Sequence, residues 1–202
     1  MKKAGSKIYK SHITCGSLLI RESQIIARLL LDNVDNHAWR QAIVIDNVLQ
    51  KRSPETAKRQ TRLIKKRLTL MEPEFWKLIV QGTSDVVIQA LLAASIKHSR
   101  LLGDFMDKVV KSHWQVFKKH LSAKDWQDYL EMCIQIDPNI QNWTDATRSK
   151  LKQIIFRILA EAKYVNNTRS LELLPVSVAP DVRSYLVVHS EDYVLKCMEA
   201  TP

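Results

Sequence analysis

The sequence predicts an all-α fold, and three observations support that class. The chain has only 4 glycines and 6 prolines in 202 residues, too few for the turns of an all-β protein. Apolar residues recur at helical spacing through most of the chain. They make up 46% of it, which is enough to bury a core and excludes a disordered polycation. We expect an N-terminal three-helix unit resembling a helix-turn-helix, packed with a larger C-terminal helical bundle.

The first three predicted helices cover residues 17–32, 36–49 and 54–68, and tight turns are expected between them. In the second helix an apolar stripe is expected from Trp39, Ala42, Ile43, Val48 and Leu49. The third begins with three start signals in a row: Ser53 as N-cap, Pro54 at the first helical position, and Glu55 in the first turn.

Further helices are predicted along the rest of the chain. We expect them at residues 73–80, 84–98, 122–136, 145–163, 181–189 and 191–198. Between the second and third of these, another helix follows His98 and runs through Phe117 to His120, either continuous or bent near Gly103. Ser122 and Asp125 match a capping box with Asp in place of Glu, and Thr144 is the expected cap of the helix after it. The segment 171–178 fits a short strand or wing as well as a loop.

The charge of the chain is concentrated at one end. The formal net charge is +10, and residues 1–70 contain 15 Lys and Arg against 5 Asp and Glu. Residues 71–202 contain 16 of each sign. Since a charge that serves solubility would be spread evenly, the asymmetry predicts a polyanion-binding end. We therefore expect two domains, a basic DNA-binding unit at 1–70 and an electroneutral helical domain at 71–202.

Two basic features make up this end. The first is an arm, Met1–Thr14, with no acid and with the lysines Lys2, Lys3, Lys7 and Lys10. The second is the helix at 54–68, whose inward stripe is Ala57, Thr61, Ile64 and Leu68. Its opposite face carries Lys58, Arg59, Arg62, Lys65 and Lys66, and Lys51 and Arg52 come just before it. These eleven basic residues are the predicted DNA-binding residues, with the third helix in the major groove.

A basic amphipathic helix such as 54–68 has two other interpretations, a solvated helix face and a membrane-surface helix. A solvated helix face normally pairs its cations with acids one turn away, and this face lacks such acids. A membrane-surface helix needs bulky apolar residues, and Ala57, Thr61 and Ile64 are too small and too few. The pattern therefore favours nucleic acid, with Arg59, Gln60 and Arg62 able to reach base edges as well as phosphates.

Other chemistries have weaker support. The cysteines Cys15, Cys133 and Cys197 are far apart and odd in number, which favours a reducing, cytoplasmic location. The histidines His98, His113 and His120 lack the i, i+4 spacing of a helical zinc site. No catalytic set and no glycine-rich phosphate loop is present, so we expect no enzyme activity, cofactor or metal. The longest charge-free apolar run, residues 86–96, is about half of a bilayer span, so no membrane association is expected.

Four segments, in this order, resemble the BrxA family of BREX (bacteriophage exclusion) systems. They are Arg52-Ser53-Pro54-Glu55-Thr56-Ala57-Lys58-Arg59, Ala93-Ala94-Ser95-Ile96-Lys97-His98-Ser99-Arg100-Leu101-Leu102-Gly103-Asp104-Phe105, Phe156-Arg157-Ile158-Leu159-Ala160-Glu161-Ala162 and Thr168-Arg169-Ser170-Leu171. None of them is a chemical motif, and their joint order makes the match specific. Together with the chain length they extend the resemblance over essentially the whole sequence.

The resemblance implies a small, helix-rich, non-enzymatic component of bacterial antiviral defence that binds double-stranded DNA. Its implied partners are the methyltransferase, the ATPase and the phosphatase-like protein of the system, and a homodimer is compatible with it. A likeness of the family to RNA antitermination folds leaves an RNA-binding scaffold or a protein-interaction module as the alternative. A DNA-modifying nuclease is a third hypothesis. The Lys97–Arg100 stretch is either functional or structural, with Arg100 pairing to Asp104 one turn on.

Overall fold

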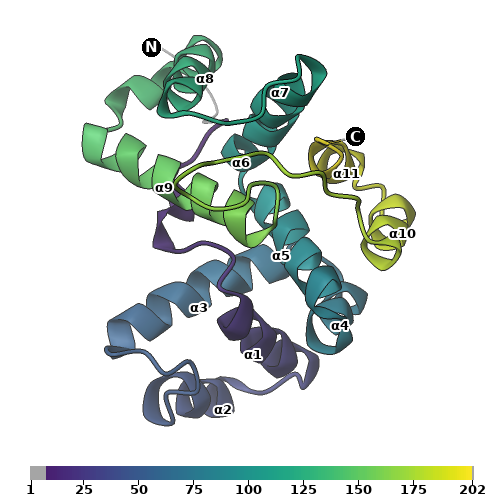
Figure 1. Cartoon of the computed structure of the whole chain (residues 1–202). Helices are drawn as coiled ribbons and strands as arrows, with labels where there is room; N and C mark the ends of the chain where they lie inside the picture. The colour runs from purple at the N-terminus through teal and green to yellow at the C-terminus, as the bar shows by residue number, and fades with distance from the viewer. Residues whose placement is uncertain (1–7, 202) are drawn as a thin grey trace, which may run out of the picture. The chain divides into compact units, whose positions relative to one another are not determined.

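The structure is a computed structural model that describes residues 8–201, and nearly all of its regular elements are helices (Figure 1). The chain divides into two compact units. The α3 unit consists of Cys15–His98 and Val178–Leu195; the α8 unit consists of the segment up to Thr14, Ser99–Ser177 and the residues from Lys196. The all-α prediction is confirmed. The division of the chain does not follow the boundary expected at residue 70, because three further helices after that residue belong to the α3 unit.

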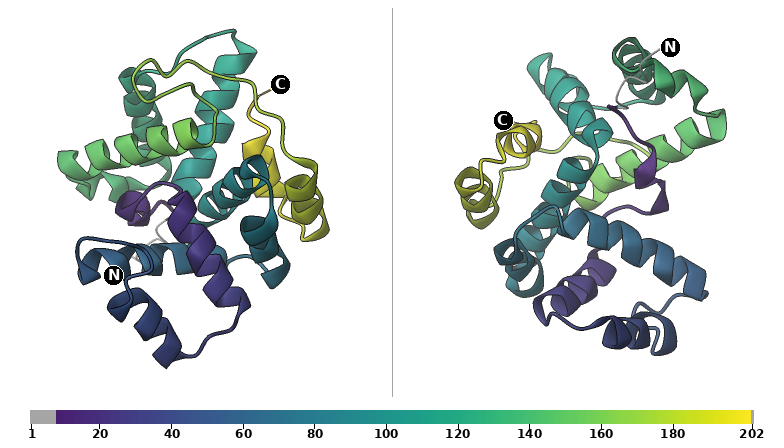
Figure 2. Two further views of the ribbon diagram at one scale, coloured as in Figure 1. Left: turned by 60° about the horizontal axis from the view of Figure 1, so that its bottom comes forward. Right: turned by 180° about the vertical axis from the view of Figure 1, so that it is seen from behind.

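The α3 unit is a helical cluster in which every long helix packs against at least two others (Figures 1 and 2). Helix α1 contacts α3, α4 and α5, and α10 covers α4 and α5. Large side chains such as Ile26, Ile64, Leu68 and Phe75 are fully buried in its core. Its helices are α1 (Ile20–Leu31), α2 (Asn36–Arg40), the π-helical turn η2 (Gln41–Ile45), α3 (Pro54–Leu68), α4 (Pro73–Gln81), α5 (Ser84–His98) and α10 (Pro180–Val188).

The α8 unit is built around the ring of Phe105. The rings of Tyr129, Trp126 and Phe156 lie 5.1, 5.8 and 6.0 Å from it, which joins α6, α8 and α9 in one aromatic core. Its elements are α6 (Arg100–Phe105), the π-helical turn η3 (Met106–Val110), α7 (Lys111–Gln115), α8 (Ala123–Ile136), the 3-10 turn η4 (Pro138–Asn142) and α9 (Asp145–Glu161). Two elements cross from one unit to the other along the chain: the 3-10 turn η1 (His12–Cys15) and α11 (Asp192–Met198).

The predicted helix caps are present. The side chain of Ser53 accepts a hydrogen bond from the amide of Thr56, and Thr144 caps α9 through the amide of Thr147. Ser122 and Asp125 form the reciprocal pair of a capping box at the start of α8. Short polar side chains ahead of an apolar pattern therefore located these helix starts correctly.

At three places the structure settles or corrects a local prediction. Helix α5 ends at His98 as predicted, and Ser99, whose backbone is extended, caps α6 with its hydroxyl. The helical elements from Arg100 to Gln115 then follow one another through the buried Gly103, which is the continuous form of the two that were expected. The second helix ends at Ile45 rather than near residue 49. No strand forms at 171–178: within the described residues the only bridges there are isolated ones, His120 with Glu172 and Val165 with Leu173. The left-handed backbone of Leu171 interrupts an extended run, and Pro175 has no amide proton to donate.

Candidate nucleic-acid interface

Helix α3 buries the stripe that the sequence predicted. Ala57, Ile64 and Leu68 are at most 1% exposed, and the Thr61 side chain is buried with them. This stripe packs on α1, η2 and α5, so the apolar side of α3 is covered within its own unit. A helix held on one side in this way leaves its other side to solvent, and that side is where the predicted cations lie.

The outer face of α3 is exposed and carries one sign of charge. Its members are all exposed: Lys58, Arg59, Arg62, Lys65 and Lys66. Glu55 in the first turn is the one acid of the helix. Within the described chain no hydrogen bond or ion pair is formed by the side chains of Lys58, Arg59, Arg62 or Lys66. Unpaired cations in a row raise the local positive potential, and a polyanion relieves that repulsion.

The remaining cations of residues 51–70 have different surroundings. Arg67 is buried, and its guanidinium donates to the carbonyls of Ser17 at 2.5 Å and Gly16 at 3.2 Å. Lys51 pairs with Glu22, and although burial opposes the charge of that carboxyl, the hydrogen bond from Lys51 lowers its pKa. Lys51 therefore joins α1 to the loop ahead of α3, and Arg67 joins α3 to the segment before α1.

Arg52 and Lys65 complete the predicted set on α3 and ahead of it. Arg52 is exposed. The ammonium of Lys65 lies 4.4 Å from the centre of the Trp39 ring, within the range of a cation–π contact. Lys65 therefore has a partner on α2, whereas the four other cations of the outer face form no hydrogen bond or ion pair within the described chain.

The connection ahead of α3 differs from the expected tight turn. It runs through residues 46–53, and Asn47 and Gln50 adopt left-handed backbone conformations. The amide side chain of Asn47 bridges both backbone groups of Lys51 at 2.9 Å, which orders the loop. Leu49 is fully buried beneath it. The expectation of a tight turn is wrong, because the chain needs this loop to bury Leu49 before α3 begins.

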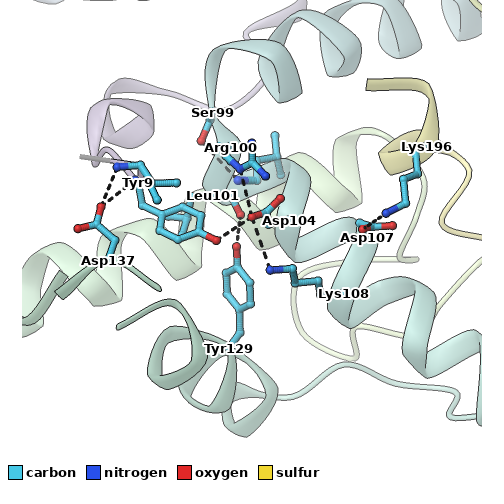
Figure 3. A network of polar contacts seen from close by, with 12 residues as sticks. Tyr9, Ser99, Arg100, Leu101, Asp104, Asp107, Lys108, Tyr129, Asp137 and Lys196 are labelled. Carbon is cyan, nitrogen blue, oxygen red and sulfur yellow. Dashed lines mark hydrogen bonds and ion pairs between the residues drawn. The ribbon is translucent and has the colours of Figure 1, made fainter. Parts of the chain in front are cut away.

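The described part of the basic arm, residues 8–14, belongs to the α8 unit. Lys2, Lys3 and Lys7 lie outside the described residues, and Lys10 is exposed. The amides of Ile8 and Tyr9 donate to Asp137, and the Tyr9 hydroxyl donates to Asp104 at 2.7 Å (Figure 3). These contacts lie within the α8 unit, so residues 8–14 of the arm and the α3 face belong to different compact units.

Asp104 is the centre of a buried polar network in the α8 unit (Figure 3). Besides Tyr9, its carboxylate lies 3.5 Å from Arg100 and 3.8 Å from Lys108. Burial, followed by the hydrogen bond to Asp104, raises the pKa of the Tyr9 hydroxyl far above its usual range. The predicted pairing of Arg100 with Asp104 is confirmed. Arg100 in the Lys97–Arg100 stretch therefore has a structural partner.

The histidines and cysteines singled out in the sequence lie at unrelated places. His113 is buried with its Nε2 3.1 Å from Asp125, and His120 contacts the carbonyl of Ser170. Cys133 is buried, as expected of a core residue. In residues 8–201 no group of three or more His, Cys, Asp or Glu side chains could hold a metal ion.

Sequence reasoning missed how charge is distributed after residue 70. The net charge of residues 71–202 is zero, but two segments of opposite charge contribute to it. Residues 108–124 contain five lysines and no acid, and residues 125–147 contain five acids and no lysine or arginine. A sliding count of charge would have found both segments. The first of them lies on the surface of the α8 unit around the turn after α7.

Comparison with known proteins gives a consistent result. The model of the BrxA family matches residues 7–190 of this chain. A protein of Paramagnetospirillum magneticum named BREX protein BrxA is 45% identical over 96% of this chain and 97% of its own length. A protein of the same name from Escherichia coli O9:H4 is 33% identical over 85% of this chain and 80% of its own.

A solved structure has the same fold. It is described as the crystal structure of an uncharacterized protein from Magnetospirillum magneticum, and it matches with a TM-score of 0.88 at 42% identity. The match covers 96% of this chain and 99% of the other. The fold therefore resembles that of the solved structure over nearly the full length of both chains.

Proposed function

Since the chain belongs to the BrxA family of BREX phage-defence systems, we propose that it serves its system by binding double-stranded DNA through the outer face of α3. One observation carries the proposal: four exposed cations of one helix, Lys58, Arg59, Arg62 and Lys66, form no ion pair within the described chain. Membership of the system makes other BREX proteins its partners. The face of α3 supplies the contact with DNA.

The charge pattern fits the duplex backbone. A helix fits the major groove, and Arg and Lys along its outer face reach phosphates on both sides of the groove. Arg59 and Arg62 are also able to donate to base edges, whereas Gln60, half-buried, contributes less than the sequence suggested. We therefore expect mainly phosphate contacts and weak sequence preference.

The packing of α3 favours nucleic acid over a lipid surface. An interfacial helix inserts its apolar face among the lipids, but the apolar stripe of α3 is buried against α1, η2 and α5. None of the helices in residues 8–201 combines the length and the apolar character needed to cross a bilayer. Because the apolar stripe is buried, the exposed cations are the part of α3 that is accessible to a ligand.

The experiment compares two triple variants of the full chain. Arg59→Ala, Arg62→Ala and Lys66→Ala together should weaken duplex binding roughly 10- to 100-fold at 0.15 M salt, because about three phosphate contacts are lost. The matched control is Lys77→Ala, Lys150→Ala and Lys163→Ala, three exposed lysines on other surfaces, which should bind within about threefold of the unchanged protein. Equal affinity of the two triple variants would place the contact elsewhere.

Two further outcomes separate the alternatives. Competition by a structured RNA of equal length should be weaker than competition by duplex DNA; the reverse order would support an RNA-binding scaffold. We also propose that the protein acts without catalysis. Incubation of plasmid DNA with Mg²⁺ or Mn²⁺ should leave it intact, and metal-dependent cleavage that co-purifies with the protein would contradict that.

A further inference from the structure

Phe117 is the most exposed large apolar side chain among residues 8–201, with 90% of its surface in water. Its φ of 57° lies in the left-handed region that aromatic residues rarely adopt. Two hydrogen bonds fix this conformation: Phe117 N to Trp114 O at 3.1 Å and Lys118 N to His113 O at 2.9 Å. An ordered turn that holds an aromatic ring out in water is typical of a binding residue.

The surroundings of Phe117 are basic. Lys118, Lys119 and His120 follow it directly, all of them exposed, within the acid-free segment 108–124. An aromatic ring that protrudes among cations matches two known modes of nucleic-acid binding, insertion between base steps and stacking on an unpaired base. In both modes the cations contact the neighbouring phosphates.

A cleft of about 530 Å³ lies close by in the same unit. Lysine and arginine supply three of its lining side chains, Lys152, Arg157 and Arg169, and no carboxylate lines it. Arg157 is held by Glu161 at 3.0 Å, which fixes the position of its guanidinium. Thr168 adds a hydroxyl group to the lining, whereas the hydroxyl of Ser122 is hydrogen-bonded to Asp125 in the cap of α8. Three cations with no carboxylate among the lining residues make a pocket suited to phosphate oxygens.

The backbone joins the turn to the cleft. Leu173 N donates to Lys119 O at 2.8 Å, and Leu121 N donates to Leu171 O at 3.0 Å. Leu121 and Leu171 both line the cleft. The five residue-to-residue steps from Phe117 to Ser122 span at most about 18 Å, which corresponds to roughly five nucleotides of one duplex strand along its axis. One strand is therefore long enough to reach both.

We propose that the α8 unit carries a second nucleic-acid-binding surface, in which strand phosphates occupy the cleft of Lys152, Arg157 and Arg169 and a base contacts the ring of Phe117. The proposal takes its ligand class from the proposed function but shares no residue with the α3 face. A protein partner is less suited to this surface, because the charged side chains that line the cleft and follow Phe117 are all cations and Phe117 itself is 90% exposed.

The test uses the full chain with duplex and single-stranded oligonucleotides that contain 2-aminopurine. Binding should change the fluorescence of the probe, because contact with an aromatic ring alters its stacking. Phe117→Ala should abolish that change, Phe117→Leu should reduce it, and Phe117→Trp should retain it. A larger change in the duplex indicates insertion between base steps, and a larger change in the single strand indicates stacking; both support the surface.

The cleft is tested separately by the salt dependence of binding. Lys152→Ala with Arg169→Ala should make the slope of log K against log salt shallower by about 2, one unit for each lost phosphate contact. The matched control, Lys77→Ala with Lys150→Ala, removes two exposed lysines that do not line the cleft and should leave the slope unchanged. Thermal melting of each variant checks that the fold is retained.

The experiments distinguish failure of the second surface from failure of the α3 interface. If the Phe117 and cleft variants behave like their control while Arg59→Ala, Arg62→Ala and Lys66→Ala weaken binding, the second surface is wrong and the α3 interface stands. If the unchanged protein binds no nucleic acid at low salt, both proposals are overturned. Loss of binding to a BREX protein in the Phe117 variants, with the fluorescence change intact, would assign the turn to a protein contact and overturn the second surface.

Discussion

The outer face of α3 and the Asp104 network place charged residues in opposite ways. On α3 the cations are exposed and Lys58, Arg59, Arg62 and Lys66 lack partners within the described chain. Around Asp104 both signs meet: the buried carboxylate lies 3.5 Å from Arg100 and accepts a hydrogen bond from the Tyr9 hydroxyl (Figure 3). Charge that stabilises a fold is buried with its partner, whereas charge left without a partner on one face is available to a ligand.

This difference predicts that variants of the Asp104 network change the stability of the protein, whereas variants of the outer face of α3 change its binding of DNA. Removing a member of a buried network leaves its partners unsatisfied and lowers the free energy of unfolding. Removing an exposed, unpaired cation changes the stability by less than about 0.5 kcal/mol, but it removes a contact with the polyanion. Variants in the two regions should therefore have opposite effects on unfolding and on DNA affinity.

The largest effect on stability is expected from Asp104→Ala. It leaves the Tyr9 hydroxyl and two cations without their acceptor, at a cost of about 2–4 kcal/mol. Urea denaturation measures the change, and the exposed Asp128→Ala on α8 serves as the control. Folded Asp104→Ala protein should keep the DNA affinity of α3. Equal stability of the two variants would show that the network does not hold the unit together.

A smaller effect comes from a pair of arginines on the same helix. Arg67→Ala removes hydrogen bonds to the carbonyls of Ser17 and Gly16 and should cost about 1–3 kcal/mol. Arg62→Ala, on the exposed face, should leave the unfolding free energy nearly unchanged and weaken duplex binding instead. Denaturation and binding measured on both variants test this. A stability loss for Arg62→Ala as large as that for Arg67→Ala would contradict the distinction between exposed and buried cations on α3.

The smallest effect is a pH dependence at Asp137. Burial opposes its charge, but hydrogen bonds from the Tyr9 amide and from Asn139 lower the pKa of this carboxyl below its ordinary value of 3.8. Below that value the unfolded chain takes up a proton before the folded chain does, so the free energy of unfolding falls as the pH falls. Asp137→Asn should show a flatter acid dependence between about pH 5 and pH 2.5 in urea titrations. Parallel curves would contradict the assignment.

Local sequence signals predicted much of the fold and the face of α3. The run Ser53-Pro54-Glu55 located the start of the helix, and its stripe from Ala57 to Leu68 is buried as predicted. These features depend on residues within a few turns of one another. The exposure of the outer cations follows from the same periodicity.

Contacts between residues far apart in the chain could not be predicted from the sequence. Tyr9 meets Asp104 and Asp137 across more than 90 residues, so the arm could not be assigned to its unit. Arg67 counts as basic in any sum, yet its guanidinium is buried against α1's leading segment. The cleft of Lys152 and Arg169 also depends on α9 meeting a distant loop.

The salt dependence of duplex binding tests the central claim most directly. If five to eight cations contact phosphates, log K against log salt should fall with a slope of about −4.5 to −7. Fluorescence anisotropy with two unrelated duplexes, titrated from low to physiological salt, measures the slope and the sequence preference together. The account predicts similar steep slopes for both duplexes. A slope near zero, or no binding at low salt, would contradict it.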